Sequence, residues 1–146
     1  MIDPKAISQD LLDRSGRAYL SGDFDAFADC FALPHTVSTF ESVRVIPDAA
    51  ALLDVFHAMR RFFESRQVTD IVRPCILADF TDPDTIRATH ETRLLAGSML
   101  VQRPSVALST IKRFGESWRV VDGQYAIPDS TAQVAALMAG SRMDDT

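Results

Sequence analysis

The fold is decided by residues 85–96, which read TIRATHETRLLA and alternate in chemical character from end to end. One set of positions carries Ile86, Ala88, His90, Thr92 and Leu94, and the positions between them carry Arg87, Thr89, Glu91 and Arg93. Successive side chains of a β-strand point to opposite faces of its sheet, so this pattern predicts a strand with one interior face. His90 belongs to the interior set and is therefore expected inside the protein.

The period of two continues on both sides of this strand. We expect further β segments at residues 36–40, 43–46, 68–79, 104–114 and 118–126. Asp82-Pro83-Asp84 is a turn sequence before residue 85, and Gly115-Glu116-Ser117 is a turn sequence between the last two strands. Short turns join antiparallel neighbours, so the pattern predicts an antiparallel sheet.

Upstream of the sheet, apolar residues recur at helical spacing. Asp3-Pro4 opens a first helix and Gly22 ends it, while Asp23 caps a short second helix that ends at Leu33-Pro34. Pro47-Asp48 opens the clearest helix of the chain. Its wide apolar stripe is formed by Leu52, Val55, Phe56, Met59, Phe62 and Phe63.

Helices followed by a meandering sheet predict an α+β fold. We expect one domain over residues 1–146, with its core at about 6–127, a short C-terminal helix at about 129–139 and a tail at 140–146. A long antiparallel sheet twists and curls, and helices packed into the curve leave a conical cavity. The sequence therefore predicts a curved sheet wrapped around helices.

Composition and motifs exclude several functions. The 20 acidic and 15 basic residues give a net charge of −5, which repels nucleic-acid phosphates. There is no signal-peptide core and no apolar run of the roughly 18 residues that a membrane span needs. Cys30 and Cys75 have no partner spacing and indicate free thiols in a reducing compartment. We expect a cytoplasmic protein that binds neither nucleic acid nor a membrane.

Cofactor and metal motifs are also missing from the sequence. It contains no glycine-rich phosphate loop, metalloprotease helix motif or nucleophile elbow. Asp79, Asp82 and Asp84 lack the spacing of a calcium loop and are interpreted as a solvated turn. We expect neither a cofactor nor a metal ion.

Two stretches resemble nuclear-transport-factor-2-like proteins. The first is residues 18–27, AYLSGDFDAF, followed by Phe31 and Thr36-Val37, and the second is Arg113-Phe114 with Trp118-Arg119-Val120. This superfamily includes SnoaL-like polyketide cyclases, ketosteroid isomerases and scytalone dehydratase, and the resemblance covers residues 6–127. It implies a cystatin-like cone fold. Because that fold hosts enzymes and non-enzymes alike, the resemblance implies no single activity.

The resemblance also shows which chemistry is missing. Aligned on these motifs, the oxyanion tyrosine of ketosteroid isomerases falls on Ser15, the general-base aspartate on Phe40 and the protonated oxyanion acid on Thr110. Without a carboxylate to take a proton or an acid–phenol pair to hold an enolate, we expect no ketosteroid isomerase activity.

The alternation and the resemblance together predict a ligand pocket inside the cone. Its expected lining is Tyr19, Phe40, Phe56, His90 and Thr110. His90 is the catalytic candidate, since imidazole acts as acid or base near neutral pH and dehydratases of the superfamily use histidine. The competing interpretation is a hydrogen-bonded core histidine. His35 is interpreted as a loop-packing residue and His57 as an exposed one.

Two functions remain open at this stage. The first is a SnoaL-like domain that binds a small apolar molecule and, if catalytic, performs cofactor-free cyclisation, isomerisation or dehydration. The alternative is a non-catalytic dimerisation or partner-binding domain whose cavity is filled by its own side chains. We also expect a homodimer, paired through an outer sheet face of small residues. This face is predicted to consist of Ser105, Ala107, Ser109 and Ile111.

Overall fold

Three N-terminal helices begin where their capping residues predict. The computed structural model describes residues 2–127 and 132–138. In α1 (Pro4–Ser21), the Asp3 carboxylate accepts a hydrogen bond from the Lys5 N–H at 3.0 Å, and Gly22 ends the helix with a left-handed φ of 78°. Asp23 caps α2 (Phe24–Ala28), and Asp48 caps α3 (Ala49–Ser65) by accepting from the Ala51 N–H at 2.9 Å.

The eight strands form one curved sheet. Its strands are β1 (Phe31–Ser38), β2 (Val43–Ile46), β3 (Asp70–Val72), β4 (Cys75–Asp82), β5 (Thr85–Ala96), β6 (Met99–Leu100), β7 (Ser105–Phe114) and β8 (Ser117–Tyr125). The order is β2-β1-β8-β7-β5-β3, and β4 and β6 also pair with β5. The sheet is mixed, because β1 and β8 run parallel while the other pairs are antiparallel. The prediction of a wholly antiparallel sheet was wrong at this one pair.

Several strand boundaries differ from the sequence prediction. The strand expected over 68–79 is two strands, interrupted at Arg73-Pro74, where proline cannot donate to a ladder. Leu33-Pro34 lies within β1 and does not end a helix. The short strand β6 was not predicted.

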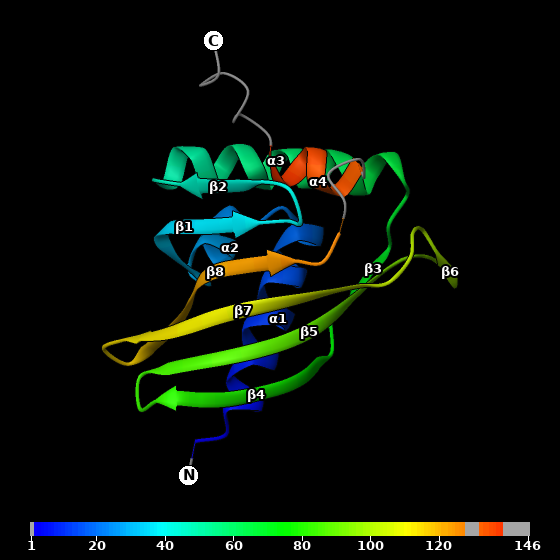
Figure 1. Ribbon diagram of the computed structural model, residues 1–146. Coiled ribbons are helices and arrows are strands. Elements are labelled where there is room, and N and C mark those ends of the chain that lie inside the picture. The colour runs from blue at the N-terminus through cyan, green and yellow to red at the C-terminus, as the bar shows by residue number, and fades with distance from the viewer. Residues whose placement is uncertain (1, 128–131, 139–146) are drawn as a thin grey trace.

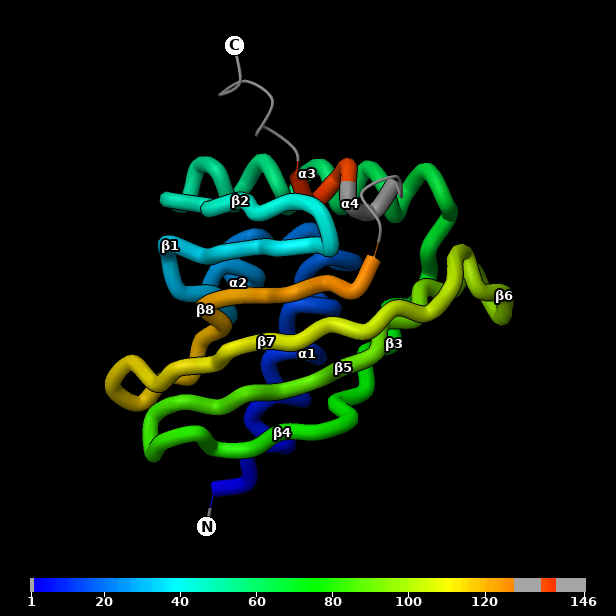
Figure 2. Tube along the Cα trace, viewed as in Figure 1, coloured from blue at the N-terminus to red at the C-terminus, as the bar shows by residue number. Residues whose placement is uncertain are grey.

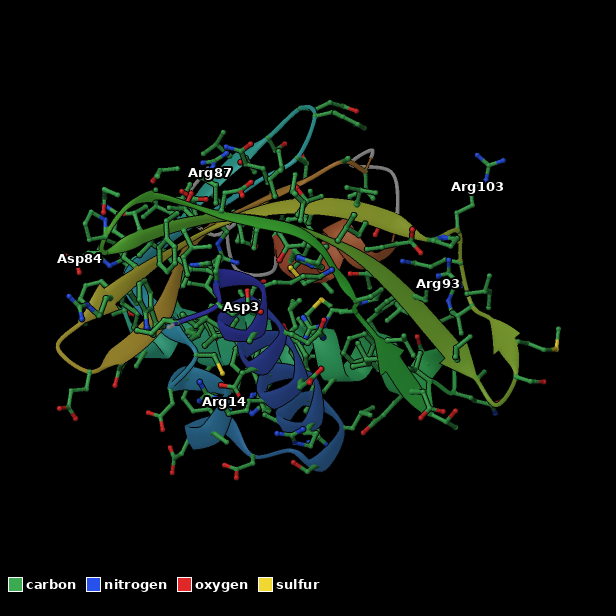
Figure 3. All side chains as sticks on the ribbon, turned by 90° about the horizontal axis from the view of Figure 1, so that it is seen from below. Asp3, Arg14, Asp84, Arg87, Arg93 and Arg103 are labelled. Atoms are coloured by element: carbon green, nitrogen blue, oxygen red, sulfur yellow. The ribbon has the colours of Figure 1, made fainter. Side chains whose placement is uncertain are left out.

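The helices lie on the concave side of the sheet. Figure 1 and Figure 2 show α1 crossing the sheet at a steep angle to the strands, while α3 runs beside the β2 edge. In Figure 3 the sheet arches over the helices, and the labelled Arg87 lies on the far side of the sheet from α1. The predicted cone is therefore present, with its interior between α1, α3 and the arch.

Two apolar clusters fill the two ends of this interior. The larger one centres on the rings of Tyr19, Phe27 and Phe56, whose centroids lie 4.6 to 5.6 Å apart. The smaller cluster contains Leu11, Cys30, Cys75, Ile86, Ala88 and Ile111. Both cysteines are buried free thiols, as predicted.

The small-residue face of β7 points inward and not outward. Ser105, Ala107, Ser109 and Ile111 are at most 9% exposed in a single chain, whereas Val106 and Leu108 between them are 40% and 39% exposed. The face proposed for dimerisation was therefore assigned to the wrong side of the strand. The small side chains leave room for α1 in the concave side.

A short C-terminal helix packs beside α3. Helix α4 (Ala132–Leu137) packs through Ala136 and Leu137 on the larger cluster, and the Leu137 carbonyl accepts a hydrogen bond from Arg44 at 3.2 Å. The predicted cap at residues 128–130 and the tail at 140–146 lie outside the described residues. Within the described ranges, no helix is both long and apolar enough to cross a membrane.

Candidate functional site

A small cavity lies between the two core clusters, under α1. Its volume is about 50 Å³. Its walls are Ser8, Leu11, Leu12, Ser15 and Tyr19 of α1, Phe31 and His35 of β1, Arg73, and His90, Ser109, Ile111, Val120, Gly123 and Tyr125 of the sheet. A second cavity of about 30 Å³ reaches toward α3 and shares Tyr19, Arg73, His90 and Tyr125 with the first. These four residues therefore form the partition between the two cavities.

Arg73 is the charged group of this partition. It sits in the break between β3 and β4, which Gln9 of α1 holds by donating to the Arg73 carbonyl at 3.0 Å and accepting from the Cys75 N–H at 2.8 Å. A Cβ added at Gly16 would come within 3.2 Å of Arg73 Nη2. The missing side chain at Gly16 thus gives the guanidinium space against α1.

The guanidinium of Arg73 is only partly satisfied. Nη2 donates to the Leu12 carbonyl at 2.6 Å and to Ser15 Oγ at 2.7 Å. Its Nε is buried and has no hydrogen-bond partner. Burial lowers the pKa of Arg73, because the charged form loses its hydration.

Two histidines stand in the same cavity as neutral imidazoles. His35 and His90 are 3% and 5% exposed. Burial lowers the pKa of each to about 4. At His35 backbone hydrogen bonds with Val120 and Val121 and the charge of Asp122 partly oppose the shift, and at His90 the positive charge of Arg73 adds to it. The Nδ1 atom of His35 is buried without a hydrogen-bond partner. Neutral imidazole offers one donor and one acceptor at pH 7.

Two phenols complete the polar lining. Burial raises the pKa of both Tyr19 and Tyr125, so both hydroxyls stay protonated and can donate a hydrogen bond. The ring of Tyr125 folds back over Gly123 of the same strand, β8. A Cβ at position 123 would come within 3.0 Å of that ring. Among the described residues that line the two cavities there is no Asp and no Glu.

Solved structures identify the architecture. An NTF2-like protein with a cystatin-like fold from Novosphingobium aromaticivorans matches with a TM-score of 0.65 at 19% identity, over 92% of this chain and 88% of its own. A domain of unknown function with a cystatin-like fold from Nostoc punctiforme gives 0.67 at 14% identity, over 98% and 86%. An NTF-2-like protein of unknown function from Shewanella oneidensis gives 0.66 at 10% identity, over 86% and 100%.

The chain has the nuclear-transport-factor-2-like fold. At these identities the likeness shows the fold alone. No protein-family model matches the sequence, and no curated protein matches it either.

Within this nuclear-transport-factor-2-like fold, the structure brings together two of the five residues predicted to line the pocket. Tyr19 and His90 face both cavities. Phe40 is 70% exposed in the loop after β1, and Phe56 is buried in the aromatic cluster, away from the cavity walls. Thr110 points to the convex side, where it accepts a hydrogen bond from Arg87 at 2.8 Å. Neither Phe40 nor Thr110 lies where the isomerase alignment put it.

Sequence reasoning missed Arg73 and His35. In the structure Ile71, Arg73 and Cys75 alternate with exposed residues, but the sequence gives no such signal, because the exposed Val72 is more apolar than Arg73. His35 stands two residues before the buried Val37, but Pro34 suggested a loop and hid the strand. Beside His90, α1 provides most of the helical wall of the first cavity, whereas Met59 and Phe63 of α3 line only the second cavity.

Two other features carry no comparable site. A larger, open hollow of about 550 Å³ lies between the start of α1 and the β7–β8 turn, and its Arg14 is already paired with Asp10 at 2.9 Å. In the β4–β5 turn, Asp82 accepts from the Asp84 N–H at 2.8 Å and Asp84 pairs with Arg113. These aspartates are therefore occupied in holding the hairpin.

Proposed function

We propose that this protein binds a compact small molecule in its cone cavity, with Arg73 and His90 among the groups that contact it. The observation that carries this proposal is a pair of buried, unpartnered polar atoms, Arg73 Nε and His35 Nδ1, on residues lining one cavity. Buried polar atoms without a partner cost about 1–3 kcal/mol each, so natural proteins satisfy nearly all of them with a protein group, an ordered water or a bound ligand.

The size of the cavity sets the size of the ligand. A volume of about 50 Å³ exceeds what one water molecule needs. It is far smaller than the roughly 300–1,000 Å³ of pockets for drug-sized molecules. The small apolar ligand expected from the sequence is thereby narrowed to a molecule of only a few non-hydrogen atoms, with an apolar part against Leu11, Ile111 and Val120.

The competing function, a cavity plugged by aromatic side chains, has less support. Phe31 and Tyr19 form part of the cavity wall but leave about 50 Å³ open, the rings of Phe27 and Phe56 pack on Tyr19 in the larger cluster, and Phe40 is in solvent. For catalysis, His90 is the acid–base group that the cavity offers. Any such reaction would proceed without a carboxylate from the described lining, which argues against isomerase-type enolate chemistry.

Methyl NMR on the protein tests cavity binding. A library of small acids, amides, alcohols and ketones is added to protein labelled at Ile, Leu and Val methyls. We expect binders to shift the signals of Ile111 and Val120 but not those of Val43 on the outer face. His90→Gln should weaken binding, and His57→Gln, on the exposed side of α3, serves as its control. A library without any compound that shifts Ile111 and Val120 would contradict the proposal.

We also propose that two copies of the chain pair through the convex sheet face. One row of cross-strand neighbours on this face runs Val43, Ser38, Gln124, Leu108, Thr89 and Leu77. Val43, Leu108 and Leu77 are 72%, 39% and 59% exposed, and apolar groups in such a row are stabilised when an identical face covers them. Light scattering should give twice the mass of one chain, and Leu108→Asp should reduce it to one. A wild-type monomer at tens of micromolar would contradict pairing.

A further inference from the structure

Arg73 is a half-buried residue whose Nε atom is fully enclosed, and its charge has no ion-pair partner in the described parts of the chain. None of the four ion pairs found there includes Arg73. Asp13, whose charge acts on Arg73, is an exposed residue of α1 that accepts a hydrogen bond from Gln9. Charged groups removed from water are normally paired, because an isolated one costs several kcal/mol even after the surroundings relax.

The other polar groups of the cavity cannot supply the missing negative charge. Tyr19 and Tyr125 remain neutral phenols, since burial raises the pKa of each. The nearby Cys30 thiol is also neutral, because burial raises its pKa. Water can satisfy a lone imidazole nitrogen, but it leaves the guanidinium charge uncompensated.

The hydrogen-bond donors around the cavity favour a negatively charged acceptor as the ligand. Arg73 Nε is free to donate, while Nη2 is fixed by its bonds to Leu12 and Ser15. The hydroxyls of Tyr19 and Tyr125 and one N–H of His90 border the same space. A carboxylate accepts several hydrogen bonds through its two oxygens and carries the charge that Arg73 lacks.

We infer that the ligand of this cavity is a small carboxylate with a short apolar body, whose oxygens accept from Arg73 Nε and from the neighbouring phenol and imidazole donors. This inference rests on the proposed function and narrows it to one chemical class. The apolar body lies between Leu11 of α1 and Ile111 of β7. A cavity of about 50 Å³ suits an acid of the size of acetate or propionate.

Isothermal titration calorimetry at constant ionic strength tests the inference with two probes of nearly equal shape, propionate and propionamide. We expect propionate to bind at least about tenfold more tightly, because charge-assisted hydrogen bonds contribute more than neutral ones. Arg73→Met keeps a side chain of similar length without the charge, and it should weaken propionate binding about 10- to 100-fold. Arg87→Met, on the convex face, is the matched control and should leave the affinity unchanged.

Each other result overturns the inference. Equal affinity for propionamide, retained propionate affinity in Arg73→Met, or equally tight binding of chloride would exclude a carboxylate site while leaving cavity binding intact. The comparison of probes in the wild-type protein decides the matter even if Arg73→Met does not fold. If neither probe gives heat at tens of millimolar, the carboxylate inference fails, and the methyl screen decides separately whether the cavity binds other molecules.

Discussion

Lowering the pH from 7 to 5 should destabilise the folded protein strongly, because two buried histidines resist protonation. Burial lowers the pKa of His35 and His90 from 6.5 to about 4. In the unfolded chain both take up protons near pH 6.5, so the unfolded state binds more protons throughout this window. The stability that these neutral imidazoles contribute is complete above pH 6.5 and is lost as the pH falls toward 4.

The expected loss follows from the size of the shift. Each pKa unit corresponds to about 1.4 kcal/mol per proton, so each histidine contributes about 2 kcal/mol between pH 7 and pH 5, and the pair contributes about 4 kcal/mol. Both side chains are almost fully enclosed, so solvent does not screen the effect away. A change of this size is a large fraction of the roughly 5–15 kcal/mol that stabilises a typical domain.

Urea unfolding at pH 7, 6 and 5 measures this loss directly. His90→Gln and His35→Gln should each remove about half of the pH dependence. His57→Gln changes an exposed histidine and should leave the dependence as it is in the wild type. A wild-type free energy of unfolding that stays constant between pH 7 and pH 5 would refute the burial of these imidazoles.

Three further outcomes test the fold and the chemistry. Phe27→Ala should lower the free energy of unfolding by about 3–5 kcal/mol, because Phe27 is 2% exposed and packs among four aromatic rings. The exposed Phe40 is the control, and Phe40→Ala should lower it by less than about 0.5 kcal/mol. Equal effects of the two changes in urea unfolding would speak against the assigned core. Asp48→Ala should cost about 1 kcal/mol through loss of the α3 cap, and unchanged thermal unfolding would argue against that cap. A β,γ-unsaturated ketosteroid should not be isomerised, because the described cavity lining has no carboxylate; turnover above a purification blank would contradict this.

Much of the fold could be predicted because its signals are local. Capping by Asp3 and Asp48 and the alternation of residues 85–96 each act within a few residues of sequence. The parallel pairing of β1 with β8 could not be predicted in this way. It joins residues near 36 to residues near 123, and only the curvature of the whole sheet brings them together.

The site was harder to predict than the fold because it depends on which side chains share an interior. Alternation placed His90 correctly, since β5 is long and regular. It failed at β7, where small residues fit either face, and at Phe40, where the strand ends two residues earlier than expected. Arg73 escaped notice because an arginine beside a proline usually indicates an exposed loop, and because its guanidinium lies against Gly16 of α1, which is far away in the sequence.

The NMR signal of the Arg73 Nε–H group tests the central claim most directly. This signal, assigned by its loss in Arg73→Met, reports on the Nε donor of the guanidinium, which is buried and has no hydrogen-bond partner among the described residues. If the cavity binds a small carboxylate, titration with propionate should shift this signal downfield in a saturable manner, and propionamide should not. An Arg73 Nε–H signal that stays in place while propionate binds elsewhere, or that exchanges with water as freely as that of an exposed arginine, would contradict the claim.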